Sequence, residues 1–314
     1  MDRALRWNRK FSQTRLGRAV CAALAADTAV VGFLPMLALV ITGCPTSLAP
    51  TAGLPEYQEI EALPVPGPAR VNAAGGNLLI MRTDLDLDTQ LGPFSVGATW
   101  NSASQKWSWS FDDLSYSAGN FVDTTGAWYN VSGLAQGAAI PGTIWVKLGQ
   151  YGQAGTNQLR TKGGLEYDFT TDGHPLYVHW TSSFKPYLAF SQTAQGDGRQ
   201  HTTSIAQCLA PAGDCHPVFS IGYDGQGRVT QISDRAGRQA LFAYDANGNL
   251  TSARDGLDVA QGWGGYRYEY TGGNLTAITN SEGERVQYQY DGAHRVTQVT
   301  QIGLGNPTRT FAYQ

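Results

Sequence analysis

Apolar and polar residues alternate in several short segments near the C-terminus. Residues 285–290 read Arg-Val-Gln-Tyr-Gln-Tyr, and residues 266–270 read Tyr-Arg-Tyr-Glu-Tyr. A period of two is the pattern of a half-buried β-strand. The Asp-Ala-Asn-Gly sequence at residues 245–248 suits a tight hairpin loop, because asparagine and glycine both tolerate positive φ. The pattern therefore predicts β-hairpins in this part of the chain.

The hairpin pattern recurs with a spacing near 20 residues. Tyr-Asp-Gly-Gln-Gly-Arg-Val-Thr begins at Tyr223 and Tyr-Asp-Ala-Asn-Gly-Asn-Leu-Thr begins at Tyr244, and related sequences begin at Tyr270 and Tyr290. Such a period indicates small units that cannot bury an apolar face alone and must stack on their neighbours. We therefore expect an all-β fold with a repetitive, architectural C-terminal part.

These units resemble the YD repeats of RHS proteins, which are also found in insecticidal toxin-complex shells and in teneurins. The match covers about residues 220–300, with a departure where Thr271 replaces the aspartate of the motif. Residues 75–115 resemble, less closely, the segment that precedes the repeats in that family. The resemblance implies a non-repeating β domain followed by YD-repeat β-hairpins that form a curved, shell-like sheet. In the family, such a shell often encloses a C-terminal toxin.

The N-terminus has the features of an export signal. A basic region precedes an apolar run from Ala29 to Ile41, which is shorter than the roughly 20 residues of a membrane span. Ile-Thr-Gly-Cys at residues 41–44 resembles a bacterial lipobox, which implies cleavage before Cys44 and lipidation of its thiol. An ordinary secretory signal or an uncleaved anchor is the alternative. We expect an exported protein that a lipid anchor holds at the outer membrane or cell surface.

Composition divides the chain into four segments. They are a signal peptide (1–43), a Pro-rich tether (44–70), a non-repeating β domain (71–217) and the YD/RHS repeats (218–314). Without the signal peptide, the chain has 16 basic and 23 acidic residues and no basic run. This balance argues against a nucleic acid as partner.

Two cysteines, Cys208 and Cys215, lie outside the signal peptide and the lipobox. In an oxidising compartment we expect them to form a disulfide. The alternative is a metal site that also uses His201 and His216, but this spacing matches no standard zinc pattern. The sequence therefore predicts a disulfide, no metal site and no cofactor.

The middle of the chain is rich in aromatic and acidic residues. Trp128 and Trp180 are the candidates for stacking on a sugar ring, although most aromatic rings at strand spacing are expected to pack in the core. Asp84, Asp86 and Asp88 share one face of a predicted strand. We interpret this face as solvated, with a cation or sugar-hydroxyl site as the alternative.

The sequence carries none of the common catalytic motifs: no Gly-x-Ser-x-Gly, no His-Glu-x-x-His and no P-loop. Asp112 and Asp113 are adjacent, so on a strand they would point to opposite faces and could not act as a pair. The chain also lacks the Asp-Pro dipeptide that the self-cleaving core of the resembled family carries. We therefore expect no enzymatic activity.

Two functions follow from these observations. The first is a membrane-tethered scaffold in cell-surface interaction or in a toxin-shell-type assembly, with no chemistry of its own. The alternative is a surface adhesin that binds carbohydrate through Trp128 and Trp180 in the middle β domain. The expected partners are the membrane, through the lipid anchor, and a glycan or cell-surface protein. A further chain is expected to associate through the C-terminal edge strand.

Overall fold

The structure is a computed structural model, and all of the residues it describes lie in the unit Gly53–Gln314. The described residues are 61–62, 69–72, 75–117, 119–150, 157–180, 183–209, 214–303, 305 and 307–313. The predicted signal peptide, its Cys44 and most of the predicted tether lie outside them. Within the described part, no helix is long and apolar enough to cross a membrane.

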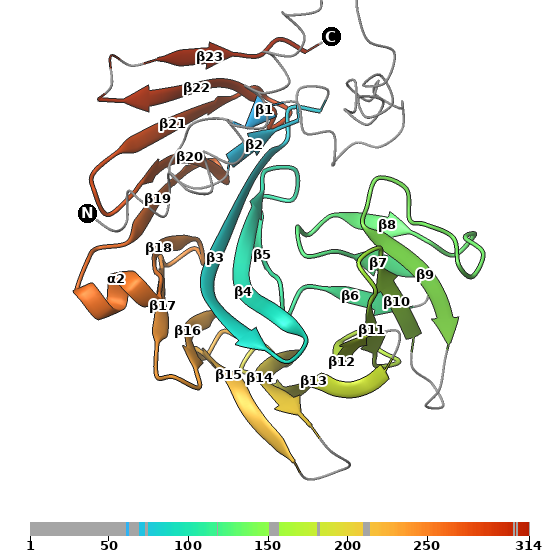
Figure 1. The fold of residues 1–314 in the computed structure, drawn as a ribbon. Coiled ribbons are helices and arrows are strands. Elements are labelled where there is room, and N and C mark those ends of the chain that lie inside the picture. Colours follow the sequence, from blue (N-terminus) through green and yellow to red (C-terminus); the bar gives the residue numbers. More distant parts are fainter. Residues whose placement is uncertain are drawn as a thin grey trace, which may run out of the picture. The chain divides into compact units, whose positions relative to one another are not determined.

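A five-stranded antiparallel sheet forms the first part of the fold (Figure 1). Its strands follow the chain order: β1 (Glu61–Ala62), β2 (Ala69–Val71), β3 (Leu78–Thr89), β4 (Gly92–Asn101) and β5 (Lys106–Trp109). The long β3–β4 hairpin contains a β-bulge between Thr83 and Leu85. A bulge changes which side chains face inward, and this one matters for the acidic strand face described below.

A three-stranded sheet follows, with its own small core. Its strands are β6 (Ser115–Ser117), β7 (Asn120–Val122) and β8 (Trp128–Asn130). Phe121 is fully buried and packs edge-on against Trp145 of the next strand along the chain. Phe169 and Tyr116 meet in the same cluster, so this sheet is fixed to the start of the large sheet by aromatic contacts.

The remaining strands form one fifteen-stranded antiparallel sheet in chain order. They are β9 (Trp145–Gln150), β10 (Asn157–Thr161), β11 (Leu165–Phe169), β12 (Pro175–Trp180), β13 (Ser183–Ala194), β14 (Gln200–Cys208), β15 (Cys215–Tyr223), β16 (Val229–Asp234), β17 (Gln239–Tyr244), β18 (Leu250–Arg254), β19 (Tyr266–Thr271), β20 (Asn274–Thr279), β21 (Arg285–Tyr290), β22 (Val296–Ile302) and β23 (Thr308–Thr310). The sheet runs without interruption through the expected boundary at residue 217, which falls within β15.

The described helix, α2 (Gly256–Gln261), lies in the longer connection between β18 and β19. Asp255 caps its N-terminus by accepting hydrogen bonds from two backbone amides, and Asp258 completes a capping box. Gly262 ends the helix in the left-handed conformation, with φ of 70°. The chain between the sequence units that begin at Tyr244 and Tyr270 therefore includes a capped helical turn.

The fifteen-stranded sheet curves around the five-stranded sheet, with β11–β13 on one side and β16–β19 on the other (Figure 1). One hydrophobic core joins the two sheets. Trp109 packs edge-on against Phe242 with ring centroids 4.8 Å apart, and Trp107 packs against Tyr268 at 5.0 Å. The expected fold class is thus confirmed: an all-β chain in which a non-repeating part precedes repeated hairpins in a curved sheet.

The corners between the repeated strands share one five-residue turn. In residues 224–228, the Asp224 carboxylate accepts hydrogen bonds from the third and fifth backbone amides at 2.9 and 3.0 Å. The fourth residue, Gly227, has φ of 74°, which glycine adopts without strain. The carboxylates of Asp245 and Asp291 accept the same two amides in their own turns. The repeated aspartate therefore satisfies the backbone of the turn.

Candidate functional site

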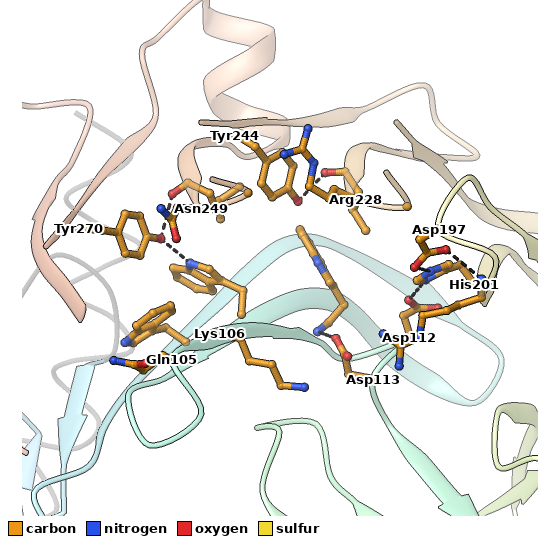
Figure 2. Close-up of a pocket in the computed structure, with 18 residues that line it drawn as sticks. Gln105, Lys106, Asp112, Asp113, Asp197, His201, Arg228, Tyr244, Asn249 and Tyr270 are labelled. Atoms are coloured by element: carbon orange, nitrogen blue, oxygen red, sulfur yellow. Dashed lines mark hydrogen bonds and ion pairs between the residues drawn. The ribbon is translucent and has the colours of Figure 1, made fainter. Parts of the chain in front are cut away.

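A cavity of about 250 Å³ lies between β5 and the corners of the first repeats. Figure 2 shows that Lys106 and Asp113 lie along the β5 side, whereas Arg228, Tyr244 and Asn249 lie opposite. We call this cavity the groove. Its lining residues are Trp100, Gln105, Lys106, Trp107, Trp109, Asp112, Asp113, Asp197, Arg199, His201, Gly227, Arg228, Val229, Tyr244, Gly248, Asn249, Leu250 and Tyr270.

One end of the groove is closed by a histidine held between two carboxylates (Figure 2). His201 of β14 contacts Asp112 through Nδ1 at 2.6 Å and Asp197 through Nε2 at 3.1 Å. The other oxygen of Asp112 accepts the backbone N–H of Thr202 at 2.7 Å. Burial lowers the pKa of His201, but the hydrogen bonds to Asp112 and Asp197 outweigh it and raise the pKa above its ordinary value.

Asp113 lines the groove beside Asp112, and both lie in a turn and not on the strand from which opposite orientations were predicted. β5 ends at Trp109, and both aspartates lie in a turn whose amides donate to the Trp109 carbonyl. The alternation of a strand therefore does not apply to them. Burial raises the pKa of Asp113, although its carboxylate accepts the Trp109 N–H at 2.6 Å.

The repeats supply the facing side of the groove through side chains that are already fixed. The Arg228 guanidinium donates to Asp224 at 2.6 Å and stacks on the Tyr244 ring, 4.9 Å from its centroid. The Tyr244 hydroxyl donates to the carbonyl of Val229 at 2.8 Å. Asn249 takes the place of the arginine in the second turn and donates to Asp245 at 2.8 Å. These contacts hold the polar rim in place.

The other end of the groove joins the β4–β5 turn to two distant repeat elements. Trp107 donates its indole N–H to the Tyr270 hydroxyl at 2.8 Å, and that hydroxyl donates to the carbonyl of Leu250 at 2.9 Å. Gln105 Nε2 lies 2.8 Å from Nδ1 of His294. Gln105 and His294 both have positive φ, 53° and 61°, so two strained backbone positions meet here.

A buried ion pair lies behind the aromatic wall of the groove. Arg82 Nε donates to Asp84 at 2.5 Å, and its guanidinium lies 5.0 Å from the Trp107 ring and hydrogen-bonds the Tyr268 hydroxyl at 3.1 Å. Burial alone would lower the pKa of Arg82, but the attraction of Asp84 and these hydrogen bonds raise it. The guanidinium therefore stays charged inside the core.

The position of Asp84 corrects the prediction of a solvated acidic face. Asp84 is buried, whereas Asp86 and Asp88 are exposed. The bulge between Thr83 and Leu85 explains the difference, because it turns the Asp84 side chain toward the core and Leu85 remains buried beside it. Simple alternation along β3 does not predict such a shift.

The other residues selected from the sequence lie outside the groove lining. Cys208 and Cys215 are joined by a disulfide, so neither thiol is available as a metal ligand in the structure. Trp128 on β8 is 59% exposed and Trp180 on β12 is 37% exposed. Among the described residues, no group of three or more histidine, cysteine or acidic side chains is arranged to hold a metal ion.

Sequence reasoning missed the groove because its parts are distant in the chain. Asp112 and His201 are separated by 89 residues, and Gln105 and His294 by 189. From the sequence, we considered His201 as a metal ligand and Asp112 as half of a carboxylate pair. Their contact depends on the packing of β5 against the large sheet, for which no local pattern exists.

Comparison with known proteins identifies the repeated hairpins. Residues 223–260 and 268–306 match the RHS repeat family model. The C-terminal hairpins match RHS repeats. The predicted resemblance to the YD repeats of RHS proteins is confirmed for these two ranges, which make up only part of the chain. Comparison with curated protein sequences finds no match.

Comparison with solved structures finds toxin-complex proteins at low identity and low TM-score. The chain is 14% identical to the crystal structure of TcdB2-TccC3-Cdc42, with a TM-score of 0.34, and covers 14% of that chain with 78% of its own length. The Photorhabdus luminescens Tc holotoxin pore with a TccC3 mutation gives 13% identity and a TM-score of 0.33, with 74% of this chain and 12% of that chain covered. The chain thus spans only 12–14% of the length of these solved chains.

Proposed function

We propose that the chain is an exported, membrane-tethered RHS-repeat scaffold that acts in cell-surface interaction or in a toxin-shell-type assembly, without chemistry of its own. The observation that carries this proposal is the continuous fifteen-stranded sheet, which runs from the non-repeating part through the RHS repeats. A continuous ladder of backbone hydrogen bonds makes a stiff surface that can hold other groups in place.

The tyrosines of the repeats support a structural role. Tyr244, Tyr270 and Tyr290 each donate their hydroxyl to a backbone carbonyl at the start of the preceding strand, at 2.8, 2.9 and 2.8 Å. Each unit is thereby attached to the one before it. The most regular side chains of the repeat thus serve its stability.

Export and tethering are tested by the state of the native protein in its source cells. We expect the protein in the membrane fraction, with the mass of the 271 residues from Cys44 to Gln314 plus acyl chains. Cys44→Ala is expected to release it from the membrane. A protein that keeps its full mass, or a Cys44→Ala variant that stays membrane-bound, would contradict the lipid anchor. A much larger species would mean that these residues belong to a longer shell protein.

Association with another chain is proposed at β23, the last strand in the order of the fifteen-stranded sheet. At the other end of the order, β9 forms a further bridge between Val146 and Ala139. Strand addition at a sheet edge requires only backbone hydrogen bonds. Sedimentation at increasing concentration is expected to show self-association, and a monomer at every concentration would contradict association between copies.

Carbohydrate binding through Trp128 and Trp180 is the second candidate function, and the exposure of both rings favours it. An exposed indole ring can pack on the apolar face of a sugar. We expect glycan-array binding that Trp128→Ala or Trp180→Ala removes. A protein that binds no glycan, or variants that bind as well as the unmodified protein, would refute this candidate.

A further inference from the structure

We propose that the groove between β5 and the repeat corners binds one neutral saccharide unit. The proposal concerns a different part of the molecule from Trp128 and Trp180, and it does not depend on export or on the lipid anchor. It rests on the size of the groove, the balance of charges in its lining, its aromatic walls and the rigidity of its polar groups.

The size of the groove limits the ligand. Its volume of about 250 Å³ is just below the range of about 300–1,000 Å³ for pockets that hold drug-sized molecules. A single sugar ring fits such a space, whereas a folded protein domain or a cluster of bulky side chains from a partner protein does not. A longer glycan would place one unit in the groove and extend along the surface.

The charges of the lining favour a neutral ligand. The lining contains side chains of both charges: the carboxylates of Asp112, Asp113 and Asp197, and the basic groups of Lys106, Arg199, Arg228 and His201. The carboxylates oppose a phosphate or another simple anion, and the cations oppose a divalent metal ion. A ligand with many hydroxyl groups can donate to the first set and accept from the second, so it uses both without a net charge.

Lys106 and Arg199 are the side chains best suited to contact such a ligand. Both are exposed, and both line the groove together with the partly exposed Asp113. Asp113 keeps one oxygen in the hydrogen bond from Trp109 N–H. A sugar hydroxyl between Lys106 and Asp113 would accept from the ammonium and donate to the carboxylate.

The aromatic walls are held in fixed orientations. Trp107 and Trp109 line the groove on the β5 side and Tyr244 and Tyr270 on the repeat side. Trp107 is fixed by its hydrogen bond to Tyr270, and Tyr244 by its hydrogen bond to a backbone carbonyl. Aromatic surface next to paired donors and acceptors suits a ring with both C–H and hydroxyl groups. Because these groups are held before binding, little conformational entropy is lost when the ligand enters.

The test is a titration of the full chain with neutral hexoses and N-acetylhexosamines, in which binding is measured by calorimetry and by tryptophan fluorescence. We expect saturable binding of at least one neutral sugar with a change in fluorescence, because Trp107 and Trp109 line the groove. Lys106→Met is expected to weaken the binding about tenfold, as for the loss of a charged hydrogen bond. Lys162→Met is the matched control, because Lys162 is exposed and lies outside the lining.

Three results would overturn the proposal. The first is a panel in which no neutral sugar binds. The second is binding that Trp128→Ala removes and Lys106→Met leaves intact, which would place the site on β8. The third is displacement of the sugar by inorganic phosphate or Ca²⁺, which would identify an ion site. None of these results bears on the scaffold role, which cell fractionation and sedimentation test separately.

Discussion

The five-stranded sheet and the RHS repeats both use an arginine–aspartate pair, in opposite environments. Arg82 lies on β3 just before a bulge and Asp84 is the extra residue of that bulge, and their side chains are 7% and 0% exposed. In the repeats the arginine follows the aspartate by four residues, as in Asp224 and Arg228, whose side chains are 21% and 29% exposed. The residue types are the same, but their surroundings differ.

The comparison shows that the same pair contributes to stability in two ways. In the repeat turn, Asp224 mainly satisfies backbone amides, and the partly exposed ion pair itself contributes little because solvent screens it. In the five-stranded sheet the pair is desolvated, so each charge depends on the other. A partly exposed pair therefore supports local geometry, whereas the buried pair determines how the two sheets pack.

The largest predicted effect comes from breaking the buried pair. Asp84→Ala leaves the Arg82 guanidinium charged among aromatic rings without its carboxylate. We expect the free energy of unfolding to fall by about 3–5 kcal/mol, as for other buried pairs that lose one partner. Urea unfolding followed by tryptophan fluorescence measures the change.

Asp86→Ala is the control for this variant, because Asp86 lies on the same strand with an exposed side chain. Its expected effect is within about 0.5 kcal/mol. Equal destabilisation by the two variants would mean that the acidic residues act through strand propensity and not through burial. The contrast between the two sheets would then lose its basis.

The next effect tests the turns of the repeats. A Cβ atom at Gly227 would lie 2.6 Å from Cγ of Asp197, and the residue has φ of 74°. Gly227→Ala therefore adds a steric clash to the strain of a left-handed alanine, with an expected cost of about 2 kcal/mol. The displaced Asp197 would also lose its contact with His201, which chemical shifts of the histidine ring would report.

Gly237→Ala separates backbone strain from the clash. Gly237 has φ of 80° in the equivalent turn before β17, and a Cβ atom there would meet nothing within 4 Å. Strain alone is expected to cost about 1 kcal/mol. If both variants lose the same stability, Asp197 moves aside freely, and the end of the groove is less rigid than its hydrogen bonds indicate.

The repeats were predictable because their rules are local. The alternating segment at residues 285–290 is β21, and the aspartate–glycine sequence at residues 245–248 closes the turn before β18. Period-two alternation and turn residues act over five to ten positions, so one sequence suffices to read them. The capped helix α2 follows no repeat rule.

The candidate site was not predictable because its chemistry arises from packing between distant segments. Asp112 was assigned to a strand that ends three residues earlier, and His201 to a metal alternative. Asp84 was assigned to the solvent face because a single-residue bulge leaves no clear mark in the alternation. Buried polar contacts of this kind depend on the tertiary fold and have no fixed spacing in the sequence.

A smaller effect distinguishes tyrosines that hold the repeats together from tyrosines that fill the core. Tyr244→Phe removes the hydrogen bond to the Val229 carbonyl, and we expect a loss of about 1 kcal/mol in the free energy of unfolding. The Tyr288 hydroxyl is buried, and no hydrogen-bond partner is found for it among the described residues. Tyr288→Phe is therefore expected to leave stability unchanged or to raise it. An equal loss in both variants would show that the hydroxyl groups do not define the role of these tyrosines.

The smallest predicted effect is a pH dependence at the join between the segment after β5 and the β13–β14 part of the large sheet. His201 lies between Asp112 of the segment after β5 and Asp197 of the β13–β14 turn, with the Tyr223 ring 5.1 Å away. Because folding raises the pKa of His201, its contribution is fully present below the unfolded pKa of about 6.5 and is lost as the pH rises through the folded value. Unfolding measured between pH 6 and pH 8 should therefore show a fall in stability that is smaller in His201→Gln, where the contribution of His179, whose pKa is also raised, remains. His216→Gln, at an exposed histidine beside Asp214, is the matched control and should retain the fall. If the His201→Gln protein keeps the same pH dependence, the two carboxylates do not hold a protonated imidazole, and the join between β5 and the large sheet depends on the aromatic contacts alone.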